Sequence, residues 1–240
     1  MAQTINTNVA SLFGQQALNK SSKGLQTAMQ RLSSGVRINS ARDDATGMST
    51  ASGFESKMRG ANMALRAANE GIAKAQINDG YHAQVYENLQ RMREIAVQKG
   101  GTASGDEYTS LKAENTRLLG LAGATGAVVV KSDGSTVTGA ATGAAVIAAN
   151  SDTVTELDAA ITNVVAARSK YGADMATFSS AAGALGTEAV NSAAQYSAVM
   201  DTDYAVETTN MLRNQILQQA GSAMLAQANQ VPNGVLALLR

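Results

Sequence analysis

The sequence predicts a mainly α-helical protein, a long antiparallel coiled-coil rod with one small β-hairpin and with its two termini paired at one end. Three observations support this fold class. Apolar residues recur at helical spacing through most of the 240 residues. The chain has one proline, no tryptophan and only three phenylalanines, so it lacks the aromatic residues of an ordinary globular core. Glycine-rich or Asp-Gly segments stand where the helical spacing stops.

Two helices are expected in the first part of the chain. The first has a narrow apolar seam that Gly35 and a polar run interrupt, and either Asp43 or Asp44 then caps a second helix by accepting its first free N–H groups. We expect this second helix to run from about Ala45 to about Gln98. The expected seam residues are, for the first helix, Ile5, Val9, Leu12, Leu18, Leu25, Met29, Leu32 and Val36, and for the second, Phe54, Met58, Leu65, Ile72, Ile77, Val85, Leu89, Met92 and Ile95.

A turn, a short helix and a hairpin are expected in the middle of the chain. Glycines at 100, 101 and 105 stop the second helix, and a short helix follows from about Asp106 to Gly120. Two short strands then flank a turn at Asp133 and Gly134, which predicts a β-hairpin near residues 127–139.

Two more helices are expected to bring the chain back. After a cap at Ser151 or Asp152, apolar residues alternate three- and four-residue steps, a coiled-coil pattern. Pro232 and Gly234 lie in the last seam, so we expect them to bend or break its final turns. The expected seam residues are Val154, Leu157, Ile161, Val164, Arg168, Tyr171, Met175, Phe178, Ala182 and Leu185, followed near the C-terminus by Leu217, Gly221, Met224, Ala228, Val231, Val235 and Leu238.

The two ends of the chain carry no acidic residues and few basic ones. The formal net charge is zero, but every acidic residue lies between Asp43 and Glu207. A monomer normally covers its exposed helix faces with mixed charge, so charge-poor ends are typical of surfaces that contact protein. Their apolar seams are too thin to offset the entropy of ordering them alone. We therefore expect both ends to be disordered in the monomer and to fold when neighbouring subunits pack around them.

The composition argues against several other functions. A balanced charge gives no reason to expect nucleic-acid binding, and no apolar stretch is long enough for membrane insertion. His82 is the only histidine and cysteine is absent, so we expect no metal site, no catalytic residues and no cofactor. Asp43 and Asp44 are adjacent carboxylates, which are helix caps far more often than an acid/base pair. The chain is therefore not expected to be an enzyme.

Four collinear motifs carry a resemblance to a known family. The chain resembles bacterial flagellins in Met1-Ala-Gln-Thr-Ile-Asn-Thr-Asn at its start and in the stretch 32–47, Leu-Ser-Ser-Gly-Val-Arg-Ile-Asn-Ser-Ala-Arg-Asp-Asp-Ala-Thr-Gly. It also resembles them in 89–98, Leu-Gln-Arg-Met-Arg-Glu-Ile-Ala-Val-Gln, and in the C-terminal segments 203–207, 215–221 and 225–232. The resemblance covers roughly residues 1–120 and 150–240.

The resemblance implies a structural subunit of two parts. Residues 1–42 and 200–240 would form the inner helical tube of the flagellar filament, and residues 43–199 the outer rod with its hairpin. The large variable outer domains of long flagellins are missing, so we expect a short form. The residues expected to pack in the inner tube are Ile5, Val9, Leu12, Leu25, Met29, Leu32, Leu217, Met224, Val231, Val235 and Leu238.

The resemblance also implies partners and a location. The main partner is the chain itself, in a helical homopolymer outside the cell. Hook-associated junction and cap proteins, the flagellar type III export apparatus and a flagellin chaperone are the further expected partners. The matching positions for contact with Toll-like receptor 5 of vertebrates are Arg91, Ile95 and Glu114.

Two alternatives stay open at the level of the sequence. One is a hook-filament junction protein, which has similar terminal helices but forms only a short ring. The other is an enzyme with a metalloprotease insert, which requires an H-E-x-x-H motif that this sequence does not contain.

Overall fold

The computed structural model describes residues 7–122, 127–129, 135–138 and 152–238, and the predicted mainly α fold is confirmed there. The chain divides into two compact units: unit 1 is Met1–Gly53 with Ala194–Arg240, and unit 2 is Phe54–Ala193. The described elements are α1 (Val9–Ser34), α2 (Ala45–Gln98), α3 (Asp106–Leu121), β1 (Ala127–Val129), β2 (Thr136–Thr138), α4 (Val154–Met200) and α5 (Tyr204–Leu238).

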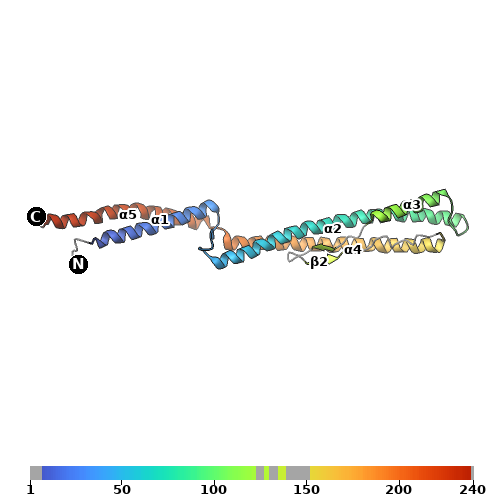
Figure 1. Ribbon diagram of the computed structural model, residues 1–240, viewed down its shortest axis with the longest axis horizontal. Helices are drawn as coiled ribbons and strands as arrows, with labels where there is room; N and C mark the ends of the chain where they lie inside the picture. The colour runs from blue at the N-terminus through green and yellow to red at the C-terminus, as the bar shows by residue number, and fades with distance from the viewer. Residues whose placement is uncertain (1–6, 123–126, 130–134, 139–151, 239–240) are drawn as a thin grey trace. The chain divides into compact units, whose positions relative to one another are not determined.

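In unit 1, α1 and α5 lie side by side and antiparallel (Figure 1). Small residues let the two helices approach closely. A Cβ added at Gly14 would lie 3.0 Å from Cδ1 of Leu225, and one at Gly221 would lie 3.2 Å from Cδ1 of Leu18. Asn8, just before α1, donates a hydrogen bond to the carbonyl oxygen of Ala228, near the end of α5. The predicted pairing of the two ends of the chain is thus confirmed for the described residues.

The other end of this helix pair is fixed by backbone hydrogen bonds. Gly35 ends α1 with φ of 73°, a left-handed conformation that glycine adopts easily, and its carbonyl oxygen accepts from the N–H of Thr202 at 3.0 Å. Arg37 N–H donates to the Met200 carbonyl at 2.6 Å. The segment after α1 is therefore paired with the segment that precedes α5.

Asp43 and Asp44 have different roles at the start of α2. Oδ1 of Asp44 accepts from the N–H of Gly47 at 2.8 Å, which makes Asp44 the cap of the helix. Oδ2 of Asp43 accepts from the N–H groups of Asn39 and Ser40 and from the Ser40 hydroxyl. These hydrogen bonds, that of the Ser40 side chain foremost, lower the pKa of the Asp43 carboxyl.

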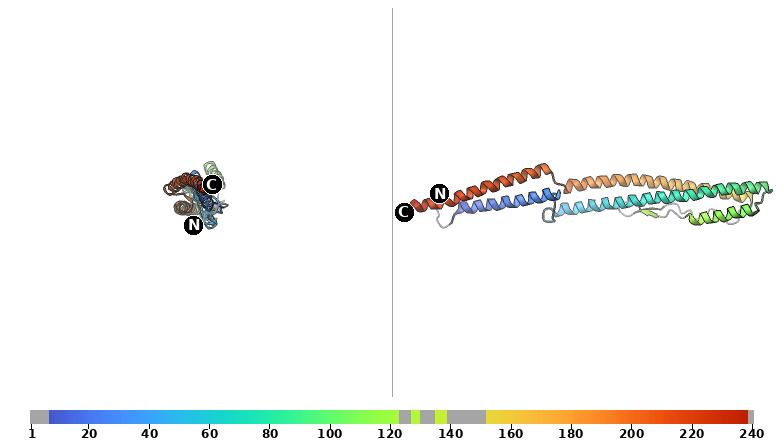
Figure 2. Two further views of the ribbon diagram at one scale, coloured as in Figure 1. Left: turned by 90° about the vertical axis from the view of Figure 1, so that its left-hand side faces the viewer. Right: turned by 90° about the horizontal axis from the view of Figure 1, so that it is seen from above.

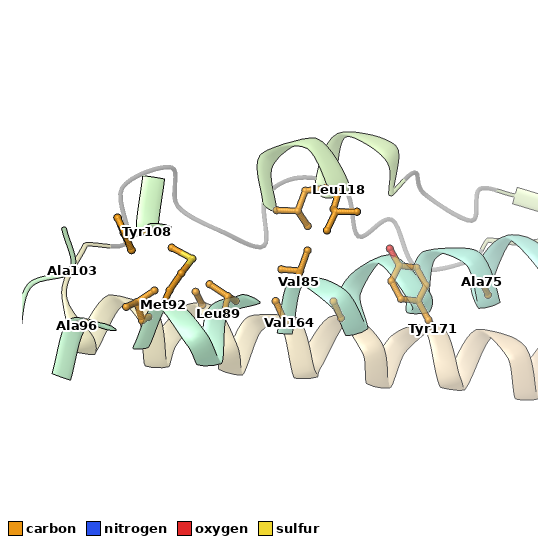
Figure 3. Close-up of a cluster of buried hydrophobic side chains, with 14 residues drawn as sticks. Ala75, Val85, Leu89, Met92, Ala96, Ala103, Tyr108, Leu118, Val164 and Tyr171 are labelled. Carbon is orange, nitrogen blue, oxygen red and sulfur yellow. The ribbon is translucent and has the colours of Figure 1, made fainter. Parts of the chain in front are cut away.

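In unit 2, α2 and α4 run side by side and antiparallel, and α3 lies along them (Figures 1 and 2). In α4 the predicted coiled-coil seam is confirmed for one residue of each heptad, which is buried, whereas the other predicted seam residues are only half-buried. Figure 3 shows the core, in which Val85 and Met92 from α2 meet Leu118 from α3 and Val164 from α4. The heptad residues are Leu157, Val164, Tyr171, Phe178 and Leu185.

The seam of α2 differs from the prediction at Ile77, which is 55% exposed. A step of five residues from Ile72 turns about 140° around a helix, so both side chains cannot lie on one face. The interior positions belong instead to Ala75 and Asn78. On the N-terminal side of these two residues, the buried positions of α2 are mostly alanines, at Ala61, Ala64 and Ala68.

The turn between α2 and α3 forms at the predicted glycines. Gly100, Gly101 and Gly105 have φ of 79°, 110° and 124°, a region that side-chain-bearing residues rarely adopt. The chain between them pairs with the start of α4, since the N–H of Ala103 donates to the Asp152 carbonyl at 2.8 Å. This pairing closes the end of the unit 2 core.

The cap of α4 is a correction to the sequence prediction. Thr153, not Asp152, caps the helix: its hydroxyl accepts from the N–H of Glu156, whose carboxylate accepts in turn from the N–H groups of Asp152 and Thr153. This reciprocal arrangement is a capping box with the T-x-x-E spacing, a signal present in the sequence. The other expected cap, Ser151, lies outside the described residues.

The predicted hairpin is confirmed as a two-stranded antiparallel sheet in which Val128 pairs with Val137. Strand β1 begins at Ala127, within the predicted range of the hairpin. The predicted turn residues Asp133 and Gly134 lie outside the described residues.

Pro232 and Gly234 were expected to bend or break the last turns, and the break is wrong, because α5 continues through both residues to Leu238. A proline inside a helix removes one N–H donor and leaves the carbonyl four residues earlier without its partner. Here that carbonyl belongs to Ala228, and it accepts a hydrogen bond from Asn8 instead. The lost helical hydrogen bond is thus replaced from α1.

Candidate assembly interface

Unit 1 buries little apolar surface of its own. Its buried apolar side chains, among the residues that the structure describes, are Ala28, Ile38 and Ala51. Many of its large apolar side chains are instead exposed, which is typical of surfaces that bind protein. These exposed residues are Val9, Leu12, Phe13, Met29, Met48, Tyr204, Val206, Leu212, Ile216, Leu217 and Met224.

Two grooves shape this surface. One runs between α1 and α5, where Ala17 and Ser21 face Leu217, Gly221 and Met224. The other lies on α5 itself and is lined by Thr209, Leu212, Arg213, Ile216 and Leu217. Small residues leave the first groove open, and larger aliphatic side chains border both. Each groove therefore offers apolar area at which a helix from another molecule can pack.

Charge is scarce on the same surface. Glu207 is the only acidic residue in α1 or α5, and it is 7% exposed. Its carboxylate pairs with the Arg31 guanidinium at 3.7 Å, inside the helix pair. The outer faces of the two helices carry apolar side chains, amides and a few cations. Two copies that pack through these faces therefore bring no carboxylates close to one another.

The predicted inner-tube residues fall into three groups. Val9, Leu12, Met29, Leu217 and Met224 are exposed, and Leu25 and Leu32 are half-buried. Ile5 and the side chains of Val231, Val235 and Leu238 lie outside the described part of the chain. The predicted seams did not include other residues of the exposed surface, among them Phe13, Leu212 and Ile216.

Arg91, expected to contact the receptor, is an exposed arginine of α2 held by two carboxylates. Its Nε lies 2.8 Å from Oε1 of Glu107 on α3, and its Nη1 lies 3.1 Å from Oε2 of Glu94. The hydrogen bond to Glu107, and then that to Glu94, raises the pKa of Arg91, while Arg91 lowers the pKa of Glu107. The guanidinium is thereby oriented on the surface of unit 2.

The other two expected receptor residues have different surroundings. Ile95 is only 6% exposed and belongs to the core side of α2. Glu114 forms a two-point ion pair with Arg117, at 2.7 and 2.8 Å, and its side chain is 42% exposed. Arg117 lowers the pKa of Glu114 through this hydrogen bond. Arg91 and Glu114 are therefore on the surface, whereas Ile95 supports it from below.

His82 is fully buried in unit 2. Its Nδ1 lies 2.9 Å from the carbonyl oxygen of Asn78, and its ring meets the Tyr171 ring edge-on, with 5.2 Å between centroids. Within the described residues, no three His, Asp or Glu side chains are grouped so that they could bind a metal ion. No described helix is both long and apolar enough to cross a membrane.

The geometry defines a helical structural protein whose terminal helix pair presents uncovered apolar faces. Comparison with known families agrees. The model of the bacterial flagellin N-terminal helical region matches residues 5–125, and that of the C-terminal helical region matches residues 154–239. The chain belongs to the bacterial flagellin family, whose members are structural subunits of the extracellular flagellar filament.

Individual relatives show the same membership. A flagellin of Xenorhabdus nematophila is 36% identical, and flagellin 1 of Proteus mirabilis 32%, each aligned over all of both chains. A flagellin of Salmonella muenchen is 50% identical over 120 residues, which are 50% of this chain and 24% of that protein. The alignments with the first two extend over 313 and 365 positions, so these relatives contain additional residues that this chain lacks.

Proposed function

We propose that this chain polymerises through unit 1, with α1 and α5 packed against the same helices of neighbouring copies as the inner layer of the filament. Residues 1–42 and 200–240 form that layer, and residues 43–199 form the rod around it. One observation carries the proposal: many large apolar side chains of unit 1 are exposed, whereas the buried apolar residues in the described part of this unit are Ala28, Ile38 and Ala51. Burial of each large side chain stabilises by about 1.5–3 kcal/mol, which is available only on assembly.

The contact between copies is heterologous and does not close on itself. The groove on α5 adjoins the groove between α1 and α5, with which it shares Arg213 and Leu217, and one copy offers both to its neighbours. Repetition of such a contact produces a helical tube instead of a ring. Neither terminal helix needs to be stable in the isolated chain, because ordering and assembly occur together.

A pair of matched substitutions tests this assignment. Leu212→Asn places an amide on the exposed face of α5, and Val165→Asn places one on an exposed position of α4 in unit 2. Filament fragments are used as seeds and elongation is followed by light scattering. We expect Leu212→Asn to slow elongation at least tenfold and Val165→Asn to leave it near the parent rate. Equal rates for parent and Leu212→Asn contradict the proposal.

The same experiment separates the subunit from a hook-filament junction protein. A filament subunit elongates seeds for as long as monomer is supplied, whereas a junction protein adds a short ring and stops. Junction and cap proteins, the type III export apparatus and a chaperone are proposed as its other partners. We propose no enzymatic activity, and turnover of a casein substrate by the purified chain would contradict that statement.

A second proposed function is recognition by Toll-like receptor 5, which Arg91 supports. The Arg91 side chain is 53% exposed and its guanidinium is oriented by Glu107 and Glu94, so a partner with carboxylate or carbonyl groups meets a preordered donor. Arg91→Ala is expected to lower activation of a receptor reporter at least tenfold. Arg93→Ala is the control, because Arg93 pairs with Asp158 on α4. Equal activation by Arg91→Ala and the parent counts against recognition through this residue.

A further inference from the structure

The carbonyl of Ala228 has no helical donor of its own. In an α-helix this oxygen accepts from the N–H four residues later, and that residue is Pro232, which has no N–H. Helix α5 nevertheless continues past the proline to Leu238. A half-buried carbonyl without a partner costs free energy, so the site needs a donor from elsewhere.

Asn8 supplies that donor. Its side-chain Nδ2 lies 2.9 Å from the Ala228 oxygen, across a separation of 220 residues in the sequence. The other end of the same amide is also used, because Oδ1 accepts from the N–H of Ser11 at 3.1 Å and caps α1. The Asn8 side chain therefore caps the start of α1 and also supplies the hydrogen bond that the Ala228 carbonyl lacks within α5.

We propose that Asn8 and Pro232 together form a register latch for the terminal helix pair. Pro232 frees one carbonyl on α5, and Asn8 can reach that carbonyl in one alignment of the helices. A slip by one helical turn would move Asn8 to a carbonyl that already accepts a helical hydrogen bond, and it would leave Ala228 unpaired. The latch can act only when α1 and α5 are folded and paired. It rests on the proposed function because we expect this folding to occur in the filament.

Substitutions separate this role from simple helix capping. Asn8→Asp keeps an oxygen for the Ser11 N–H, so it preserves the cap, but it has no donor for Ala228. Pro232→Ala restores the N–H that Ala228 lacks, so the carbonyl no longer depends on Asn8. If Asn8 only caps α1, Asn8→Asp has the same effect with Pro232 or with Ala at that position.

The register is read by disulfide cross-linking, which the absence of native cysteine makes clean. A Cβ at Gly14 would lie 3.9 Å from Cβ of Leu225, within the range of a disulfide. Gly14→Cys with Leu225→Cys therefore reports the native register. Gly14→Cys with Gly221→Cys or with Asn229→Cys reports a slip of one turn in either direction.

Cross-linking is performed on assembled filaments of the full chain, and intramolecular products are quantified on a denaturing gel. We expect Asn8→Asp to lower the ratio of native to slipped product two- to tenfold, the factor for loss of one hydrogen bond. In the Pro232→Ala background we expect the ratio to change less than twofold. An unchanged ratio with Pro232 present, or the same loss in both backgrounds, overturns the latch.

Failure of the proposed function has a different signature. A parent chain that does not elongate seeds contradicts assembly through unit 1, whatever its cross-links. In that case the parent, Asn8→Asp, Pro232→Ala and the double variant are oxidised as unassembled chain at high concentration. The effect of Asn8→Asp on the ratio of native to slipped product, with Pro232 and with Ala at that position, then decides whether the latch exists.

Discussion

Asn88 donates from Nδ2 to Oδ1 of Asn115 at 2.8 Å, and this hydrogen bond joins α2 to α3 inside unit 2. Both side chains are buried, and Nδ2 of Asn115 lies 3.4 Å from the sulfur of Met92. A polar pair at this depth specifies how the short helix aligns on the long one, because any other alignment leaves amides unsatisfied.

The first prediction concerns Asn115. Asn115→Ala removes the acceptor of the buried Asn88 Nδ2 donor, so we expect the free energy of unfolding of unit 2 to fall by about 1–3 kcal/mol. Asn163→Ala, at an exposed position of α4, is the control and is expected to change it by less than about 0.5 kcal/mol. Denaturant unfolding measures both. Equal stability of Asn115→Ala and the parent would show that the pair contributes nothing.

The second prediction concerns pH. The Asp152 carboxylate accepts from the Tyr108 hydroxyl at 2.7 Å and from Lys112 Nζ at 2.9 Å, and these contacts, Tyr108 foremost, lower the pKa of Asp152. The folded state therefore binds the proton more weakly than the unfolded state. The stabilisation is fully present above the ordinary aspartate pKa, about 3.9, and is lost as the pH falls through the lower folded value.

We accordingly expect the unfolding midpoint of unit 2 to fall when the pH drops below about 4. Asp152→Asn is expected to unfold at a lower temperature than the parent at pH 7 and to lose part of the acid dependence. Asp106→Asn, at an exposed carboxyl of the first turn of α3, is the control. Thermal unfolding followed by circular dichroism measures all three. Parallel pH curves for the parent and Asp152→Asn contradict this assignment.

The third prediction concerns two glycines of α2. A Cβ at Gly47 would lie 2.7 Å from Cδ1 of the buried Ile38 and would collide with the Asp44 carboxylate that caps the helix. Gly47→Ala is therefore expected to destabilise unit 1 by about 1–3 kcal/mol. Gly53→Ala meets no atom within 4 Å and is expected to stabilise the helix by about 0.5–1 kcal/mol. Thermal depolymerisation of filaments made from each variant measures the difference, and the opposite order is the contradicting result.

The sequence predicted the helices of unit 2 well, because regular spacing and strong stop signals coincide there. Helix α2 has the predicted bounds, and the heptads of α4 point inward as expected. Ile77 was misplaced because large apolar residues were weighted over alanine, although Ala75 is the buried neighbour. The T-x-x-E spacing that begins at Thr153 is a capping-box signal in the sequence, and it marks the start of α4.

Other features depended on contacts that one segment cannot show. Pro232 is compatible with helix because Asn8, far away in sequence, supplies the missing donor. The exposure of Phe13, Leu212 and Ile216 depends on which sides of α1 and α5 face each other. The spacing of apolar residues within one helix does not specify that orientation. The scarcity of charge at the two ends is evident in the sequence. It predicts a protein-binding surface on the helices of unit 1, which is the surface of the assembly proposal.

Amide hydrogen exchange of the full chain, as dilute monomer and as filament, tests the central proposal most directly. We expect the amides of α1 and α5 to exchange within seconds in the monomer and to become protected by at least a hundredfold in the filament, while the unit 2 part of α4 is protected in both. Strong protection of α1 and α5 in the dilute monomer, with no gain on polymerisation, would contradict the proposal that neighbouring copies order these helices.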